Sequence, residues 1–182
     1  MADARGTAGA RLRLAQAIAR KRVPLGFLVA VVTLLVADPT WESWRAGLVV
    51  ALAGEAIRVW AAGHLEKSRE VTRSGPYRWI GHPLYAGSAV VALGVVIAAR
   101  HVLVTALAAA YMIVTLSAAI RTEESFLRER FGAAYDSYRD PRAEPMRRAF
   151  SIDRAIRNRE HRAVFGLAGG FALLALKILG TL

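Results

Sequence analysis

The side chains best suited to chemistry fall in two short segments of the 182-residue chain. The first is His82-Pro83-Leu84-Tyr85, which follows a Gly75-Pro76-Tyr77 turn, and the second is the carboxylate pair Glu123-Glu124. Proline at the first helical position costs no hydrogen bond, so we expect a helix to begin at Pro83. His82 is expected to be extended because it precedes proline. The free amides and the dipole of such a helix N-terminus favour a bound anion, for example a carboxylate.

The paired carboxylates suit a cationic or polyhydroxylated ligand. One of Glu123 and Glu124 can take an ammonium group while the other accepts hydrogen bonds from ribose hydroxyls. Tyr85 lies about half a turn into the helix and can turn back over the same spot. A ligand with a carboxylate, an ammonium, a ribose and a flat base would use all of these groups. S-Adenosylmethionine has those parts and a sulfonium besides, so the residues indicate a zwitterionic, nucleoside-like ligand.

Other kinds of site are excluded or not expected. The chain has no cysteine, which excludes disulfides, thiolate metal sites and cysteine nucleophiles. No G-x-G-x-x-G motif follows a predicted strand, which excludes a soluble Rossmann-type enzyme. We expect no metal site.

Five apolar stretches surround the two segments, and each is expected to cross a membrane. They are residues 23–37, 46–62, 83–99, 102–120 and 163–182. Only Arg100-His101 separate the third from the fourth, which predicts a tight helical hairpin. The expected fold is an all-α integral membrane protein, a bundle of about five transmembrane helices with a cytoplasmic cofactor pocket.

The charge distribution gives the orientation. The chain is 55% hydrophobic yet carries 25 Lys and Arg against 14 Asp and Glu, a net charge of +11. Of the 25 basic residues, 21 lie in the N-terminal segment, in residues 63–82 and in residues 121–162, which five spans place on one side. The positive-inside tendency puts that side in the cytoplasm. The charge therefore reports topology, and no groove-reading motif supports a nucleic-acid partner.

This pattern divides the chain into four parts. Residues 1–22 are expected to form a basic amphipathic helix, 23–62 the first two transmembrane helices, 63–140 a core with both chemical segments, and 141–182 a basic segment and a C-terminal transmembrane helix. The basic surplus would rest on anionic lipid headgroups. A composition rich in Ala and Arg and free of Cys is compatible with a bacterial inner membrane.

From residue 57 to residue 138 the sequence resembles the isoprenylcysteine carboxyl methyltransferases and their relatives among membrane phospholipid methyltransferases. The resemblance rests on Gly75-Pro76-Tyr77, His82-Pro83-Leu84-Tyr85, the hairpin, Glu123-Glu124, and Phe131-Gly132 with Tyr135 and Tyr138. It implies a membrane methyltransferase that binds S-adenosylmethionine at the cytoplasmic end of the bundle. The cofactor contacts that it implies are Tyr77, His82, Pro83, Tyr85, Glu123 and Glu124, with Val71 and Thr72 contributing backbone groups.

Two departures from the family pattern bear on the acceptor. The family commonly has arginine before His-Pro, where this chain has Gly81, so Arg73 or Arg78 would have to replace it. The chain also continues through a basic stretch and a further apolar segment, where family members often stop soon after the tyrosine pair. Both departures weaken a close analogy in substrate.

The predicted function is methyl transfer to a lipidic or amphiphilic acceptor from the bilayer, most like carboxyl O-methylation of an isoprenylcysteine-type substrate. A carboxylate acceptor needs no general base, and no catalytic residue is assigned. Arg121 and Arg128 are candidates for holding an anionic acceptor group. The alternative enzyme is a phospholipid N-methyltransferase, whose amine must lose a proton to His82, a glutamate or water. The non-enzyme alternative is a membrane scaffold or transporter subunit.

Several of the residues also have a purely structural interpretation. Glu124 could pair with Arg128 one helical turn on, and Tyr135 and Tyr138 could be interfacial aromatics. Glu55 and Arg58 lie three residues apart inside a span, where an ion pair suggests a function or a structural pair close to the interface. The spacing of Gly166 and Gly170 predicts close helix packing.

Overall fold

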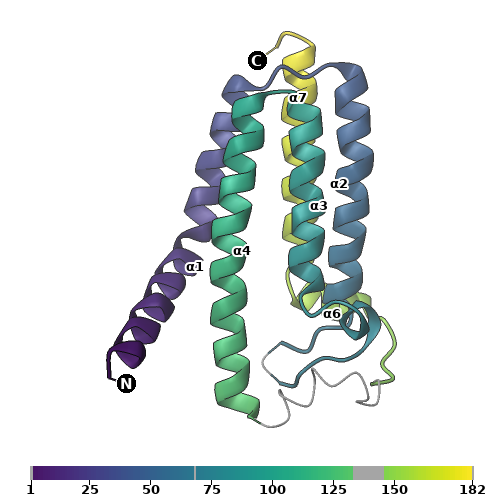
Figure 1. Cartoon of the computed structure of the whole chain (residues 1–182). Coiled ribbons are helices and arrows are strands. Elements are labelled where there is room, and N and C mark those ends of the chain that lie inside the picture. The colour runs from purple at the N-terminus through teal and green to yellow at the C-terminus, as the bar shows by residue number, and fades with distance from the viewer. Residues whose placement is uncertain (1, 68, 133–145, 182) are drawn as a thin grey trace.

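The computed structural model describes residues 2–67, 69–132 and 146–181, with side chains from Arg13 onward. It is 79% helical, and the described part contains no strand. Five long helices run side by side, and a 3-10 turn and a short helix lie at one end of them (Figure 1). The elements are α1 Ala2–Val36, α2 Trp41–Ala62, η1 Gly75–Arg78, α3 Pro83–Ala99, α4 Val102–Phe131, α6 Ile152–Arg157 and α7 Glu160–Ile178.

The first helix joins two segments that the sequence separates. The basic stretch expected over residues 1–22 and the span expected over 23–37 form one continuous α1. Pro24 lies inside it, and α1 changes direction part-way along, so that its N-terminal part leads away from the bundle (Figure 1). A proline inside a helix removes one backbone hydrogen bond and commonly produces such a bend.

Helices α2 and α3 pack through glycines. A Cβ added at Gly94 of α3 would lie 2.6 Å from the backbone nitrogen of Ala51, and one at Gly54 of α2 would lie 2.6 Å from that of Val91. A Cβ at Gly87 would lie 2.7 Å from the Gly54 carbonyl oxygen. The two backbones therefore approach more closely than any side chain would allow, as small residues permit in membrane helices.

The predicted hairpin is present, but its two helices pack mainly on other neighbours. Helix α3 ends at Ala99 and α4 begins at Val102, as the sequence predicts. Most of the contacts of α3 are with α2, and most of those of α4 are with α1. Helix α4 continues past the expected span to Phe131, and Gly132, with φ of +46°, ends it.

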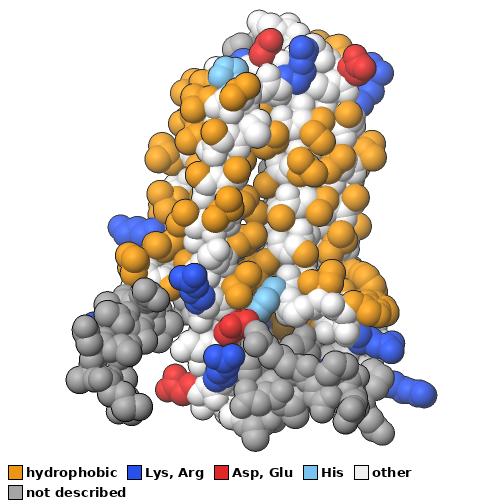
Figure 2. All heavy atoms as spheres, in the orientation of Figure 1, with side chains coloured by type: hydrophobic (Ala, Val, Ile, Leu, Met, Phe, Trp, Pro, Cys, Tyr) orange, Lys and Arg blue, Asp and Glu red, His pale blue; other side chains and the backbone are white. Residues whose placement is uncertain are grey.

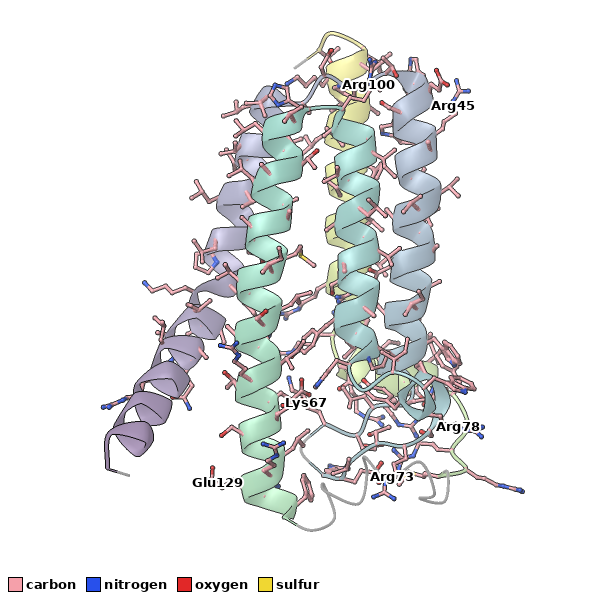
Figure 3. All side chains as sticks on the ribbon, in the orientation of Figure 1. Arg45, Lys67, Arg73, Arg78, Arg100 and Glu129 are labelled. Carbon is pink, nitrogen blue, oxygen red and sulfur yellow. The ribbon has the colours of Figure 1, made fainter. Side chains whose placement is uncertain are left out.

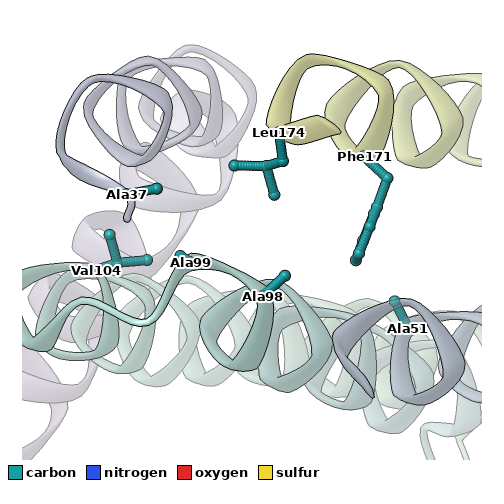
Figure 4. Packing of buried hydrophobic residues seen from close by; sticks show 7 residues of the cluster. All are labelled: Ala37, Ala51, Ala98, Ala99, Val104, Phe171 and Leu174. Carbon is teal, nitrogen blue, oxygen red and sulfur yellow. The ribbon is translucent and has the colours of Figure 1, made fainter. Parts of the chain in front are cut away.

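One end of the bundle is closed by a small apolar core. Ala37, Ala51, Ala98, Ala99, Val104, Phe171 and Leu174 form this cluster (Figure 4). Trp44 of α2 packs edge-on against Phe171 and donates a 2.8 Å hydrogen bond to its carbonyl. Lys177 of α7 donates to the carbonyls of Leu34 and Leu35 at 2.6 and 2.8 Å, where α1 ends with free carbonyl groups. The last helix is thus joined to the first two.

The outer surface is apolar between charged ends. Large hydrophobic side chains stand exposed on α1, α2, α4 and α7, among them Phe27, Val49, Ile113 and Phe165. Figure 2 shows apolar side chains across the middle of one face, with charged groups gathered toward its two ends. By length and composition, α4 and α7 can cross a membrane, and α3 is apolar but has only 17 residues. The all-helical prediction is confirmed, whereas the prediction of five spans is not, because only α4 and α7 of the described helices qualify as candidate spans.

The expected packing role of Gly166 and Gly170 is wrong. A Cβ at either position would meet no atom within 4 Å, and the same holds for Gly169. Gly166 and Gly170 instead border an internal cavity. Spacing of small residues shows where a helix could be approached closely, whereas the glycines that are approached lie in α2 and α3.

We expect Gly94→Ala to destabilise the protein by about 1–3 kcal/mol, because its Cβ would collide with backbone atoms of α2. The matched control is Gly169→Ala, which meets open space and gains up to about 1 kcal/mol of helix propensity. Thermal unfolding followed by circular dichroism in detergent measures both. Equal midpoints for the two variants would contradict the close approach of α2 and α3.

Candidate functional site

His82 ends an extended stretch and precedes the first turn of α3. Its φ and ψ are −132° and 66°, outside the helical region, as its position before Pro83 predicts. The amides of Tyr85 and Ala86 both donate to its carbonyl at 3.1 Å. The Ala86 bond is the ordinary first bond of the helix, whereas the Tyr85 amide, which the sequence left available to a bound anion, is already engaged. The side chain of His82 is therefore the more informative group.

That side chain lies between the two carboxylates of α4. Nδ1 of His82 is 3.6 Å from Glu123 Oε2, and Nε2 is 3.7 Å from Glu124 Oε1. These are ion-pair distances, too long for good direct hydrogen bonds. The sequence assigned both glutamates to a ligand, and the structure brings both of them to His82. The resulting cluster joins the start of α3 to the last part of α4.

The charge of His82 follows from these neighbours. The Glu123 carboxylate raises the pKa of His82 above its ordinary value of 6.5, partial burial opposes the rise, and Glu124 adds to it. An opposite charge close by favours the protonated imidazole. The imidazolium therefore bridges two carboxylates, and Lys67 adds further positive charge at Glu123.

Tyr85 covers the imidazole from one side. The two rings stack with centroids 5.6 Å apart and an interplanar angle of 26°. The Tyr85 hydroxyl also interacts with the Glu123 carboxylate and with Arg22 of α1. Three helices therefore meet at His82, and the predicted residues His82, Pro83, Tyr85, Glu123 and Glu124 form one site.

The loop between α2 and α3 carries the remaining predicted contacts. Thr72 is buried and accepts a 3.4 Å hydrogen bond from the Glu66 amide, while Val71 and Tyr77 are half-buried. No described contact joins Val71, Thr72 or Tyr77 to His82. Figure 3 shows Lys67 of this loop beside the lower part of α4, and Lys67 contributes positive charge at Glu123. The loop therefore reaches the His82 cluster through Lys67.

Within the loop, position 75 can be occupied only by glycine without strain. Its φ is +57°, in the left-handed region, and a Cβ there would lie 2.6 Å from the ring of His64. His64 is itself buried, with Nδ1 3.0 Å from the Trp60 carbonyl. The adjacent Ser74 hydroxyl is buried and has no hydrogen-bond partner among the described residues. A buried polar atom of this kind is uncommon in a folded protein and marks a place where a ligand could bond.

Comparison with known families assigns this part of the chain. The model of the phospholipid methyltransferase family matches residues 47–134, just under half of the chain. Residues 47–134, called the methyltransferase segment below, are therefore similar to that family. The predicted resemblance to the group that contains the isoprenylcysteine carboxyl methyltransferases is thereby confirmed. No curated protein and no solved structure matches the chain.

The methyltransferase segment spans α2, α3 and α4, and so includes the whole His82 cluster. Arg121 and Arg128 of α4 are exposed. Arg121 precedes Glu123 by two residues, which turns it roughly 200° away around the helix. Tyr135 and Tyr138 lie outside the described residues.

Arg73 and Arg78, which were predicted to replace the family's arginine before His-Pro, lie on the loop between α2 and α3. Arg78 is exposed and covers the ring of Trp79 at 5.5 Å. Arg73 and Arg78 lie away from α4 in Figure 3. A Cβ at Gly81 would meet nothing within 4 Å, so the space that a side chain would fill at this position is open.

A segment after the methyltransferase match holds the loop in place, which the sequence did not predict. Arg154 binds Glu66 at 2.9 Å and also donates to the Gly63 carbonyl, and Arg148 binds Glu70. Asn158 donates to the carbonyls of Ala62 and Leu65, both at 2.9 Å. The sequence shows these residues only as a basic run, because their partners lie some 80 to 100 positions earlier.

The Glu55 and Arg58 pair extends to a third charged residue. Arg58 Nε is 3.2 Å from Glu55, and Nη2 is 2.8 Å from Glu160 of α7. Arg58 also donates to the hydroxyl of Ser88 in α3. The structural role that the sequence left open is thus evident, since one guanidinium joins α2, α3 and α7.

We expect Glu123→Gln to lower the pKa of His82. Because the parent pKa is raised above 6.5, the stability gained from this contact is complete below about pH 6.5 and is lost as the pH rises through the raised value. NMR titration of labelled histidine, assigned with His82→Gln, measures the shift. Glu129→Gln, an exposed change on the same helix, is the control and should leave the titration unchanged. A parent His82 that titrates at or below 6.5 would overturn this electrostatic account.

We expect Arg154→Gln to loosen the loop, because it removes the ion pair with Glu66 and the bond to the Gly63 carbonyl. Trypsin should then cut at Lys67 and nearby arginines several-fold faster, as mass spectrometry of timed digests would show. The control is Arg157→Gln, since the Arg157 side chain is 64% exposed and lies as far as 4.0 Å from the Glu66 carboxylate, which makes their ion pair weak. Equal cleavage rates in both variants would show that the C-terminal segment does not hold the loop.

Proposed function

We propose that this protein is an integral membrane methyltransferase that uses S-adenosylmethionine and acts on a lipidic or amphiphilic acceptor. The observation that carries the proposal is the cluster of His82 between Glu123 and Glu124, inside the segment that matches the phospholipid methyltransferase family. Its two carboxylates are groups that could face the ammonium and sulfonium of such a ligand.

The residues present fit such a cofactor. The carboxylates of Glu123 and Glu124 would face its cationic groups, and Tyr85 would lie along a flat or cationic part of it. The backbone at Val71 and Thr72 and the side chain of Tyr77 would contribute from the loop. The buried Ser74 hydroxyl, which lacks a partner, offers one more hydrogen bond.

S-Adenosylmethionine supplies a methyl group activated on a sulfonium. The chain has to align this donor with the acceptor and exclude water from the space between them. His82 serves as the charged centre that holds the two glutamates in place, since it is favoured in its protonated form. A protonated His82 is a poor base, so an acceptor that must lose a proton would give it to a glutamate or to water.

Two acceptor chemistries are proposed. The first is O-methylation of a carboxylate, as on an isoprenylcysteine-type substrate, with Arg121 or Arg128 near the anionic group. The second is N-methylation of a lipid amine, and the phospholipid methyltransferase match is equally compatible with both. In both, the acceptor enters from the bilayer, and we place the site at the cytoplasmic face of a bacterial inner membrane. The basic residues at that end would rest on anionic headgroups.

Cofactor binding tests the proposal. Calorimetric titration of the purified chain with S-adenosylhomocysteine should show saturable binding, weakened at least tenfold in His82→Ala and Glu123→Ala. Glu129→Gln should bind like the parent. Absence of saturable binding would leave the scaffold or transporter reading, and unchanged binding in both alanine variants would place the cofactor elsewhere.

Label transfer separates the two acceptors. Tritiated methyl from the cofactor should enter a component of a total lipid extract, and mass analysis then identifies what became labelled. Label lost in mild base indicates an ester and the first chemistry, whereas stable label indicates an amine. Extracts that take up no label, despite measurable cofactor binding, would contradict a lipid acceptor.

A further inference from the structure

The bundle contains a pocket of about 420 Å³, open over part of its surface, between its two pairs of packed helices. All five long helices contribute to its wall. It lies where α3 and α4, though joined by two residues, pack mainly on α2 and α1. A cavity of this size is in the usual range for a small-molecule site.

Much of the wall comes from outside the methyltransferase segment. Helix α1 supplies Gly26 and Leu34, and α7 supplies Gly166, Gly170 and Phe171. The glycines leave room that larger residues would fill, since a Cβ at Gly166 or Gly170 would meet no atom within 4 Å. The remaining lining is largely aliphatic, so a hydrocarbon is the natural occupant.

The polar side chains of the wall are mostly engaged already. Tyr111 donates a 3.0 Å hydrogen bond to the Arg22 carbonyl, and the Ser88 hydroxyl donates to the Leu84 carbonyl at 2.8 Å. Ser88 also receives a hydrogen bond from Arg58. The hydroxyls of Tyr111 and Ser88 are therefore already paired within the protein.

Glu55 is different. It is 6% exposed and lines the cavity; within the described part of the chain its Oε1 has no hydrogen-bond partner, while Oε2 lies 3.2 Å from Arg58. Arg58 also binds Glu160, so one guanidinium serves two carboxylates and one negative charge remains. A buried acceptor without a donor costs free energy, which a ligand that donates a hydrogen bond would recover.

We propose that this cavity binds an amphiphile with one hydrocarbon chain, whose alcohol or amine head donates a hydrogen bond to Glu55 Oε1. The surplus negative charge excludes a carboxylate or phosphate head. A volume of about 420 Å³ suits a single hydrocarbon chain. Ser88 lies one helical turn from Tyr85, so the head of this ligand would sit close to the His82 cluster. Binding here is independent of methyl transfer and of the proposed cofactor.

The test is binding of three amphiphiles of equal chain length to the purified full chain in nonionic detergent without any methyl donor. Tetradecanol, tetradecylamine and tetradecanoic acid differ in the head alone, and native mass spectrometry gives an apparent Kd for each. The alcohol and the amine are expected to bind at least tenfold more tightly than the acid. An acid that binds as tightly as the other two overturns the proposal.

Two neighbouring glycines supply a matched pair of variants. Gly170→Leu fills the cavity and should reduce binding of the alcohol and the amine at least tenfold. Gly169→Leu adds the same side chain at a position that has open space but does not line the cavity, and it should bind like the parent. Equal binding in the two variants would mean that the amphiphiles bind elsewhere, because partition into detergent is the same for both.

Glu55→Gln tests the head group. It removes the surplus charge, so the preference for the amine over the acid should fall several-fold. If Gly170→Leu does not fold, by its unfolding midpoint, Gly166→Leu replaces it. S-Adenosylhomocysteine binding is measured on every variant and should survive in Gly170→Leu. In the parent chain, cofactor binding without amphiphile binding refutes the cavity proposal alone, whereas amphiphile binding without cofactor binding refutes the proposed function alone.

Discussion

The arrangement of the bundle depends on one guanidinium. Arg58 of α2 binds Glu55 on its own helix, Ser88 on α3 and Glu160 at the start of α7. Removing one partner from a buried ion pair leaves a charge uncompensated and costs several kcal/mol, of the order of 3–5. Arg58 therefore fixes α2, α3 and α7 relative to one another, because removing any one of its partners would destabilise the contact between these helices. The same contact joins the methyltransferase segment to α7, which lies outside it, and forms one end of the internal cavity.

Much of this could be predicted from local sequence. Pro83 and the Arg100-His101 break fixed the limits of α3 and the start of α4, because proline position and charge act within a few residues. The association of His82, Tyr85 and Glu123 also followed, though from motif order and resemblance and not from physics. The prediction that the glutamates face a ligand directly omitted their contact with His82. That contact crosses two helices, and no local pattern encodes it.

What the sequence could not show is which surfaces meet. Gly166 and Gly170 have the spacing of a packing motif and face a void, whereas Gly54 and Gly94 bring two backbones together. The helical period places residues on a face but does not say which neighbour covers that face. The same holds for charged residues such as Arg154 and Glu66. In the sequence each is one of many charged residues in a basic segment, and only the fold shows that they form an ion pair. Sequence reasoning is reliable here within a helix and fails between helices.

The bonds from Lys177 to the carbonyls of Leu34 and Leu35 make the two outermost long helices neighbours. The pocket between the two helix pairs is thereby bordered by α7 as well as by α1. A substitution on the inner face of α7 therefore changes the shape of this pocket without altering any residue of the methyltransferase segment.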